Sequence, residues 1–231
     1  WGFPVSRAAL TWCRKHNVAS ILMSESKWDD EKRYWWKERL KSWLYVRHFD
    51  TALVGGSHHA DYLKRLGLPR QNIFEGYDAV DNAYFVSQAA IARRDGPKTR
   101  ERQPLIPQRP YFLSVTRLIE RKNVGRLLQA YADYYGKFGS EAWDLVICGS
   151  GSEAKRLKQQ AQRLDLTEKL HFPGFLPYQA ISDWYGLANA FIHPALHEQW
   201  GLVVNEACAA GLPILCSKTI GAQIALVRDG Q

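Results

Sequence analysis

Two glutamates, Glu198 and Glu206, offer the clearest chemistry in this sequence. They stand eight positions apart, on either side of Gly201. If a helix begins near Leu202, the free backbone N–H groups of its first turn form a site for a phosphate group. A carboxylate beside a diphosphate would be repelled, so we expect the two acids to accept hydrogen bonds from neutral hydroxyl groups further along the same ligand. A nucleotide sugar has all of these parts.

The elements around the two acids must place them at one end of a sheet. An apolar run ends at His193 and Pro194, a short polar segment follows, and the helix-forming letters LVVNEACAA come after Gly201. Gly211 and Pro213 then lead into a second apolar run. The pattern predicts a strand, a loop, a helix, a turn and a second strand.

This stretch resembles the E-x7-E signature of retaining glycosyltransferases with the GT-B fold, in the large family 4. The matching residues are Glu198, Trp200, Gly201, Leu202, Glu206, Ala207, Ala209, Gly211 and Pro213. The resemblance implies that Glu206 holds the ribose hydroxyls of the donor and that Glu198 holds the hydroxyls of the transferred sugar. It also implies that the N–H groups of Leu202 and Val203, which follow Gly201, bind the diphosphate. Retention of configuration is implied by the resemblance alone.

A second segment, after a predicted strand at residues 111–115, carries two cations. It resembles the G-R-L-x-x-x-K-N-x segment of the same family, with Arg117 and Lys122 in the clamp positions and Thr116 in place of the usual Gly. Fixed cations stabilise a diphosphate leaving group without a metal. We therefore expect Arg117, Lys122 and Glu198 to carry the catalytic chemistry. The alternative is that the two cations are ordinary surface charges on a loop.

Two further turns complete the predicted donor site. Gly149 opens the segment GSGSE, where small residues let the chain bend tightly. By the resemblance, the backbone around Phe175 and Leu176 meets the nucleotide base. The predicted donor-binding residues are Arg117, Lys122, Gly149, Phe175, Leu176, Glu198, Gly201, Leu202, Val203 and Glu206.

The first half offers two candidates for the acceptor side. A predicted strand at residues 19–23 delivers Glu25 at its carboxyl end, where ligands gather in open α/β sheets. A second predicted strand at residues 51–54 is followed by two glycines, a serine and His58. The alternatives are a capping or solvated loop acid for Glu25 and an ordinary loop histidine for His58.

A basic, tryptophan-bearing helix is predicted over residues 29–47. Trp36, Leu40, Trp43 and Leu44 form one apolar stripe, with several Lys and Arg around it. We expect this stripe to pack on the sheet. The alternative is that it lies on an anionic membrane surface.

Alternating strands and helices predict an α/β protein with parallel, doubly wound sheets. Residues 92–110 contain four prolines and little apolar periodicity, which predicts a linker with a boundary near Gln108. By the resemblance, residues 1–108 are a partial acceptor-side domain and residues 109–231 a truncated donor-binding domain. We expect two incomplete Rossmann-like domains of the GT-B fold that face a cleft, in a fragment of a longer enzyme.

Composition narrows the class of protein. With 46% hydrophobic and 23% charged residues, the chain is typical of a soluble globular protein. Its four cysteines are scattered, which favours reduced thiols and a cytoplasmic location, with peripheral contact at the inner membrane face as an option. Up to Gln108 there are 18 Lys and Arg against 12 Asp and Glu, which would attract anionic partners. Acids interrupt the charged linker and no aromatics interleave with it, which argues against nucleic acid.

The predicted activity is transfer of a sugar from a nucleotide-diphosphate sugar to an acceptor. The acceptor is a sugar, a lipid-linked molecule or a polysaccharide. No Asp-x-Asp stands near the site, so we expect no metal and no other cofactor. One alternative is another GT-B sugar-nucleotide enzyme, an epimerase or phosphorylase. The other is a basic module that binds membrane or nucleic acid without catalysis.

Overall fold

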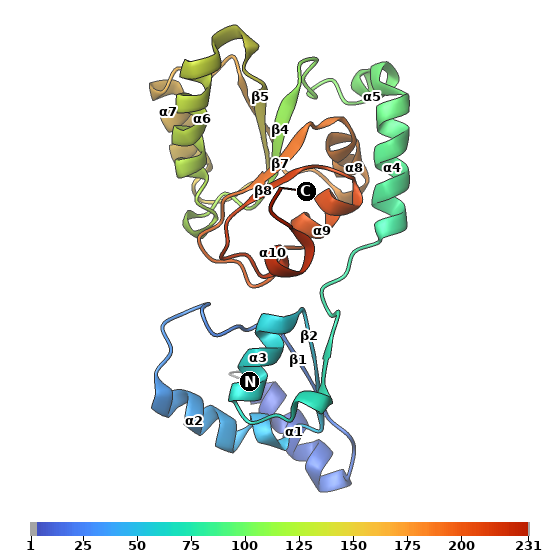
Figure 1. The fold of residues 1–231 in the computed structure, drawn as a ribbon, viewed down its shortest axis with the longest axis vertical. Coiled ribbons are helices and arrows are strands. Elements are labelled where there is room, and N and C mark those ends of the chain that lie inside the picture. Colours follow the sequence, from blue (N-terminus) through green and yellow to red (C-terminus); the bar gives the residue numbers. More distant parts are fainter. Residues whose placement is uncertain (1–3, 231) are drawn as a thin grey trace. The chain divides into compact units, whose positions relative to one another are not determined.

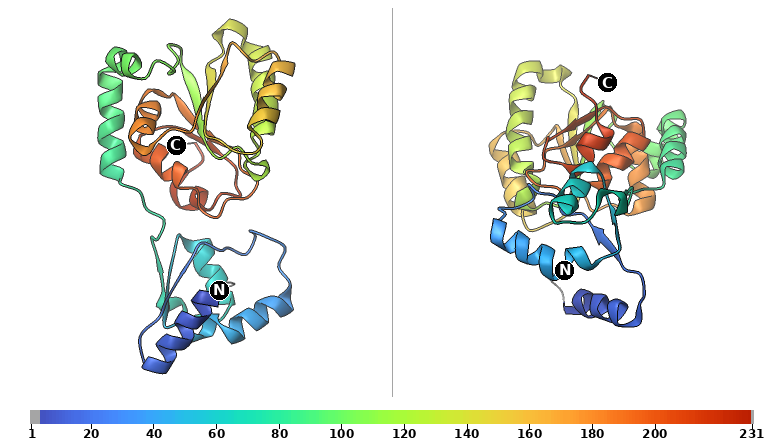
Figure 2. Two further views of the ribbon diagram at one scale, coloured as in Figure 1. Left: turned by 180° about the vertical axis from the view of Figure 1, so that it is seen from behind. Right: turned by 60° about the horizontal axis from the view of Figure 1, so that its bottom comes forward.

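The computed structural model describes residues 4–230. By packing, the chain divides into two compact units, Trp1–Ala79 and Val80–Gln231, which we call unit 1 and unit 2. Both are α/β, as Figures 1 and 2 show.

Unit 1 is built on a parallel three-stranded sheet with the order β1-β2-β3. Its elements are α1 (Pro4–His16), β1 (Ile21–Ser24), α2 (Trp35–Leu44), η1 (Val46–His48), β2 (Thr51–Val54), α3 (Ser57–Arg65), η2 (Arg70–Asn72) and β3 (Ile73–Glu75). The core lies between β2 and α3, where Ala52, Val54, Tyr62 and Leu63 are buried. All three strands end at the same edge of the sheet because they are parallel.

Unit 2 contains a parallel five-stranded sheet with the order β6-β5-β4-β7-β8. Its elements are α4 (Asn82–Arg94), α5 (Gly96–Arg102), β4 (Tyr111–Val115), η3 (Glu120–Lys122), α6 (Val124–Phe138), η4 (Gly139–Glu141), β5 (Asp144–Cys148), α7 (Ala154–Arg163), β6 (Leu170–Gly174), α8 (Tyr178–Leu187), β7 (Ala190–His193), α9 (Leu202–Ala209), β8 (Ile214–Cys216) and α10 (Gly221–Leu226). This is a doubly wound sheet whose strand order reverses between β4 and β7.

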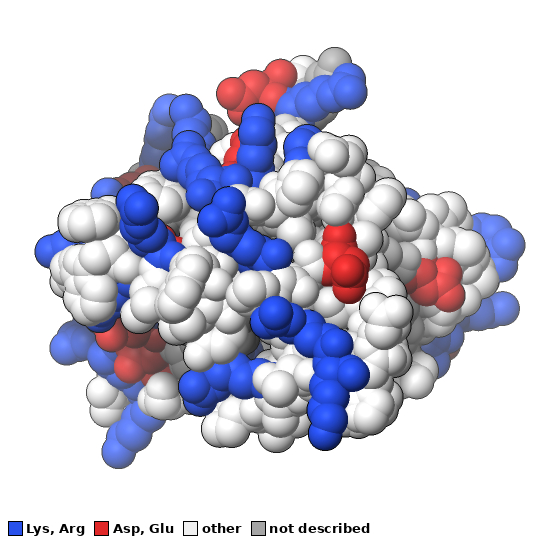
Figure 3. Space-filling view, turned by 90° about the horizontal axis from the view of Figure 1, so that it is seen from below, with Lys and Arg blue, Asp and Glu red and all other residues white. Residues whose placement is uncertain are grey.

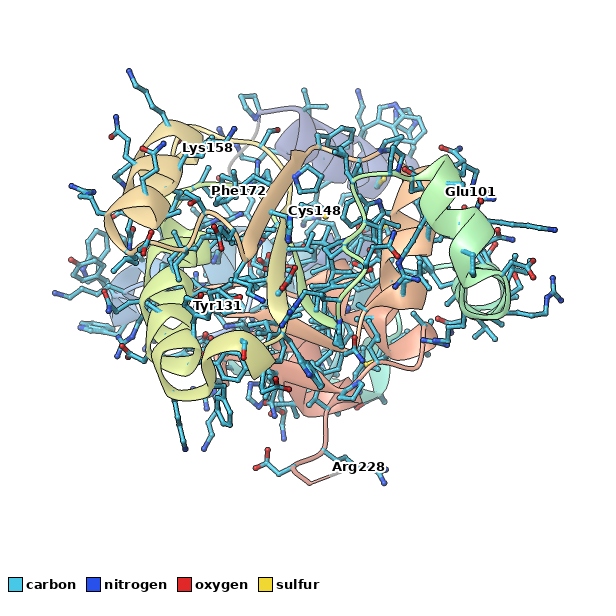
Figure 4. All side chains as sticks on the ribbon, turned by 90° about the horizontal axis from the view of Figure 1, so that it is seen from above. Glu101, Tyr131, Cys148, Lys158, Phe172 and Arg228 are labelled. Atoms are coloured by element: carbon cyan, nitrogen blue, oxygen red, sulfur yellow. The ribbon has the colours of Figure 1, made fainter. Side chains whose placement is uncertain are left out.

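Helices cover both faces of this sheet (Figure 1). Side chains alternate between the faces along each strand, as the period of two requires. Val146 and Cys148 of β5 join the core formed with α8 and α9, whereas Leu145 and Ile147 join the core formed with α6 and α7. In Figure 4, Tyr131 on α6 lies against the sheet, and its hydroxyl donates to the Trp143 carbonyl oxygen at 2.9 Å.

The predicted linker is wrong. Residues 82–94 and 96–102 form the helices α4 and α5, and the chain divides at Ala79 rather than near Gln108. Helix α4 belongs to unit 2 because it packs closely on α8. A Cβ atom added at Gly186 of α8 would stand only 2.6 Å from the Cβ of Ala92. Glycine at this position lets the two helices approach, a contact that local composition does not reveal.

The predicted helix over residues 29–47 is shorter in the structure. Helix α2 begins at Trp35, so Asp29 and Asp30 lie outside it. Both carboxylates contact the Lys27 ammonium group instead, at 2.9 and 3.2 Å. Because a buried lysine needs anionic partners, the contacts of Lys27 with Asp29 and Asp30 favour a non-helical turn at these residues over an extension of the helix. The apolar stripe of α2 also differs from the prediction, since Trp36, Leu40 and Trp43 are exposed rather than packed on the sheet.

Candidate functional site

The candidate site of unit 2 lies at the carboxyl ends of β4 and β7, where the strand order reverses. In open α/β sheets this crevice is the usual ligand site. The segment after β4 contains Arg117 and Lys122, and the segment after β7 contains Glu198 and Gly201. Two positions far apart in the sequence therefore meet because β4 and β7 are neighbours in the sheet.

One backbone hydrogen bond and one side-chain hydrogen bond hold the two segments together. The Leu196 N–H donates to the Arg121 carbonyl oxygen at 2.9 Å. The Asn123 side chain donates to the Pro194 carbonyl oxygen at 3.2 Å. Because these contacts join the segments directly, the position of Lys122 relative to Glu198 is set by the backbone.

Lys122, Glu198 and His193 form a buried cluster. The Lys122 ammonium group contacts Glu198 Oε2, and His193 Nε2 stands 3.5 Å from the same oxygen. Burial and the nearby guanidinium groups of Arg121 and Arg117 lower the pKa of Lys122 to about 8, while the Glu198 carboxylate beside it favours the charged form. Burial, together with the Lys122 charge, lowers the pKa of His193 to about 3, so this imidazole is neutral at pH 7. The cluster therefore holds one cation and one anion against a neutral ring.

The amino end of α9 provides backbone donors beside this cluster. Helix α9 begins at Leu202, as predicted, after Gly201 with a φ of 101°. The Val204 N–H donates to the Gly201 carbonyl oxygen at 2.8 Å, so the N–H groups of Leu202 and Val203 lie in the first turn ahead of that bond. Any L side chain at Gly201 would be strained, because φ is positive and an added Cβ would stand 3.2 Å from the Glu198 side chain. The site can therefore accept an anion close to the Lys122 charge.

Glu206, on the same helix, is held by a buried tyrosine. The Tyr185 hydroxyl donates to Glu206 Oε2 at 2.7 Å, and the Tyr185 side chain is fully buried against Phe85 and Phe191. Burial raises the pKa of Glu206 above its ordinary value, and the hydrogen bond from Tyr185 offsets part of this rise. One carboxylate oxygen is thus fixed by the protein, and the contact of Glu206 with a ligand stays a prediction.

The remaining donor-site predictions fall on neighbouring turns. Arg117 is exposed two residues after β4, and Gly149 follows β5, whose last residue Cys148 is labelled in Figure 4. Phe175 and Leu176 follow β6; the Phe175 ring is 75% exposed, while Leu176 packs on the core. These turns are joined, since the Gly149 N–H donates to the Gly174 carbonyl oxygen at 2.7 Å. Their roles toward a ligand stay predictions.

The two acceptor-side candidates lie in unit 1, at the carboxyl edge of its sheet. Glu25 directly follows β1, and the exposed His58 is in the first turn of α3, which follows β2. Asp78, after β3, is a third group at this edge. Burial, and secondly the Glu25 charge, raise the pKa of Asp78 to about 6. Acceptor binding by these residues stays a prediction.

Sequence reasoning assigned no role to two residues that the structure places in the site. His193 was visible as the last residue of the strand before the site, but its contact with Glu198 was not. Tyr185 carried no spacing signal, because it reaches Glu206 from a different helix.

The described residues also bear on two other classes of site. None of the helices within residues 4–230 is both long and apolar enough to cross a membrane. In the same range, no three His, Cys, Asp or Glu side chains gather as ligands for a metal ion. Metal independence stays a prediction, which removal of divalent ions would test.

The family model described as "Glycosyl transferases group 1" matches residues 95–231. Among curated relatives, a D-inositol 3-phosphate glycosyltransferase of Corynebacterium jeikeium is 31% identical over 68% of this chain and 40% of its own length. An alpha-monoglucosyldiacylglycerol synthase of Streptococcus pneumoniae is 31% identical over 45% of this chain and 23% of its own. The chain thus spans less than half the length of these curated relatives.

Solved structures share the fold. The crystal structure of Anabaena Alr3699/HepE in complex with UDP has a TM-score of 0.78 at 18% identity, over 97% of this chain and 60% of that one. The lipopolysaccharide outer core galactosyltransferase WaaB has a TM-score of 0.69 at 18% identity, over 98% of this chain and 57% of that one. The predicted GT-B fold, present here in part, is confirmed by these likenesses.

Proposed function

This chain belongs to the glycosyl transferases group 1 family, and on that premise we propose that it transfers a hexose from a nucleotide-diphosphate sugar with retention of configuration and without a metal. The observation that carries the proposal is the cluster of Lys122, Glu198 and the amino end of α9 at the β4–β7 crevice. A cation and helix N–H groups suit a diphosphate, and an adjacent carboxylate suits sugar hydroxyls.

Each residue has a part in the proposed mechanism. Arg117 and Lys122 neutralise the diphosphate as it leaves, and the N–H groups of Leu202 and Val203 add hydrogen bonds to it. Glu198 holds hydroxyls of the transferred sugar. Glu206, oriented by the Tyr185 hydroxyl, accepts from the ribose hydroxyls. Catalysis then consists of positioning and leaving-group stabilisation, with no side chain acting as a general base.

For the acceptor we propose only its chemical class and two contact residues. Glu25 and His58 would contact an acceptor that is a sugar, a lipid-linked molecule or a polysaccharide, at a cytoplasmic location. The name of one relative supports a lipid acceptor, because it refers to a diacylglycerol. The name of another refers to inositol phosphate, which lies outside the three classes.

The Glu206→Ala substitution tests the donor site. We expect the chain to bind one of UDP, GDP or ADP and the variant to bind it about tenfold to hundredfold more weakly, because charge-assisted hydrogen bonds to the ribose are lost. In a thermal-shift panel, ligand at about 100 times its dissociation constant should add about 2.7 kcal/mol of stability to the parent chain.

The matched control is Glu168→Ala, which removes an exposed acid before β6, at the opposite end of the sheet. It should bind nucleotide as the parent does. EDTA should leave the thermal shift that nucleotide causes unchanged, both in the parent and in Glu168→Ala. Equal binding by Glu206→Ala and the parent would refute the proposed ribose contact, and loss of binding on adding EDTA would refute metal independence.

Nucleotide binding should weaken with rising pH. The pKa of Lys122 is lowered to about 8, so the free protein loses this positive charge as the pH rises through that value. A diphosphate favours the charged form, and affinity should fall about tenfold between about pH 7 and about pH 9. Titration calorimetry of the parent and of Lys122→Arg, whose guanidinium stays charged, measures this. An equal decline in both proteins would contradict the role of Lys122.

A further inference from the structure

Helix α2 of unit 1 carries its charged side toward the protein. Lys41 is the buried residue of this helix, and its ammonium group donates to the Tyr62 hydroxyl at 2.5 Å. The Tyr62 hydroxyl donates in turn to Glu38 Oε2 at 2.6 Å, and Arg33 also reaches the Tyr62 hydroxyl, at 2.9 Å. Charged partners therefore join α2 to Tyr62 of α3.

The opposite side of α2 is apolar and exposed. Trp36, Leu40 and Trp43 follow one another at helical spacing, and their side chains are 52%, 48% and 65% exposed. Trp35, beside them, is 76% exposed. Because burying these side chains would be favourable and the protein buries a lysine instead, the face is suited to contact with something outside the chain.

Cations surround this exposed face. Lys37 stands 5.4 Å from the centre of the Trp36 ring. On the other side, a groove of about 550 Å³ is lined by Trp28, Trp35, Glu38, Arg39, Ser42, Trp43, Arg47, Arg65, Leu66 and Gly67. Its one acid, Glu38, is paired inward with Lys41. Figure 3 shows Lys and Arg prevailing over Asp and Glu on the face seen from below.

We propose that the outer face of α2, formed by Trp35, Trp36, Leu40 and Trp43 with Lys37 and Arg39, lies on the surface of an anionic lipid bilayer. Tryptophan partitions to the membrane interface, and each nearby Lys or Arg is attracted to anionic head groups. A second copy of this chain is a poorer occupant, because an isologous contact would bring the same cations together. The proposal uses no residue of the donor site.

Vesicle flotation tests the proposal. We expect the chain to float with phosphatidylcholine vesicles that contain about 30% phosphatidylglycerol, and far less with phosphatidylcholine alone. The triple variant Trp36→Ser, Leu40→Ser and Trp43→Ser should bind the anionic vesicles at least about tenfold more weakly. Raising the salt concentration to about 0.5 M should release most of the parent protein.

The control is Phe138→Ser on α6, which removes another exposed aromatic ring with a lysine beside it. It should bind vesicles as the parent does, and all three proteins should bind nucleotide equally. Unchanged vesicle binding by the triple variant, or no binding of the parent to anionic vesicles, would overturn the proposal. A parent dimer in solution that the triple variant abolishes would assign the face to a second copy instead.

Discussion

Lys122→Ala should weaken binding of the nucleoside diphosphate by at least about a hundredfold. The substitution removes a charge-assisted contact to the diphosphate, which contributes about 1.5–3 kcal/mol. It also leaves the Glu198 carboxylate, whose side chain is 13% exposed, without the ammonium group that it contacts. An unpaired buried carboxylate repels a second anion, so the two losses act in the same direction. Titration calorimetry of the diphosphate and of the uncharged nucleoside would measure them.

The nucleoside serves as the internal reference, because it lacks the anionic group and should lose little affinity. The double variant Lys122→Ala with Glu198→Gln should bind the nucleoside diphosphate about tenfold more tightly than Lys122→Ala alone, since the repelling carboxylate is gone. A loss below about threefold for Lys122→Ala, or an equal loss for the nucleoside, would show that the diphosphate lies elsewhere.

Gly149→Ala should lower the free energy of unfolding by about 3 kcal/mol or more. Gly149 has a φ of 139°, and an added Cβ would stand 1.8 Å from the Thr116 carbonyl oxygen. That backbone cannot move away freely, because the Thr116 N–H donates to the Cys148 carbonyl oxygen at 2.9 Å. Steric overlap and backbone strain therefore add. Urea unfolding followed by circular dichroism gives the change.

Gly136→Ala is the matched control. Gly136 lies within α6, and an added Cβ would meet nothing within 4 Å. Alanine should raise the free energy of unfolding here by about 0.5–1 kcal/mol, because glycine loses more backbone freedom in a helix. Similar effects at the two glycines would show that the turn after β5 is not tightly packed.

The candidate site divides into contacts that are local in sequence and contacts that are not. Gly201 and the start of α9 were predictable, because a glycine before a helix-forming run is a local signal. The contact between Lys122 and Glu198 joins residues from two loops, and it depends on β4 and β7 being neighbours. The hydrogen bond from Tyr185 to Glu206 likewise depends on how α8 packs beside α9.

Periodicity and composition predicted the parallel α/β architecture, the order of most strands and helices and the motif residues. These features depend on short segments, whose preferences act over a few residues. The unit boundary at Ala79, the inward Lys41 of α2 and the cluster around Glu198 depend on partners distant in the chain. An apolar stripe shows that a helix has two faces, but which face is buried is decided by the partners that tertiary packing supplies, here Tyr62 and Glu38 for Lys41.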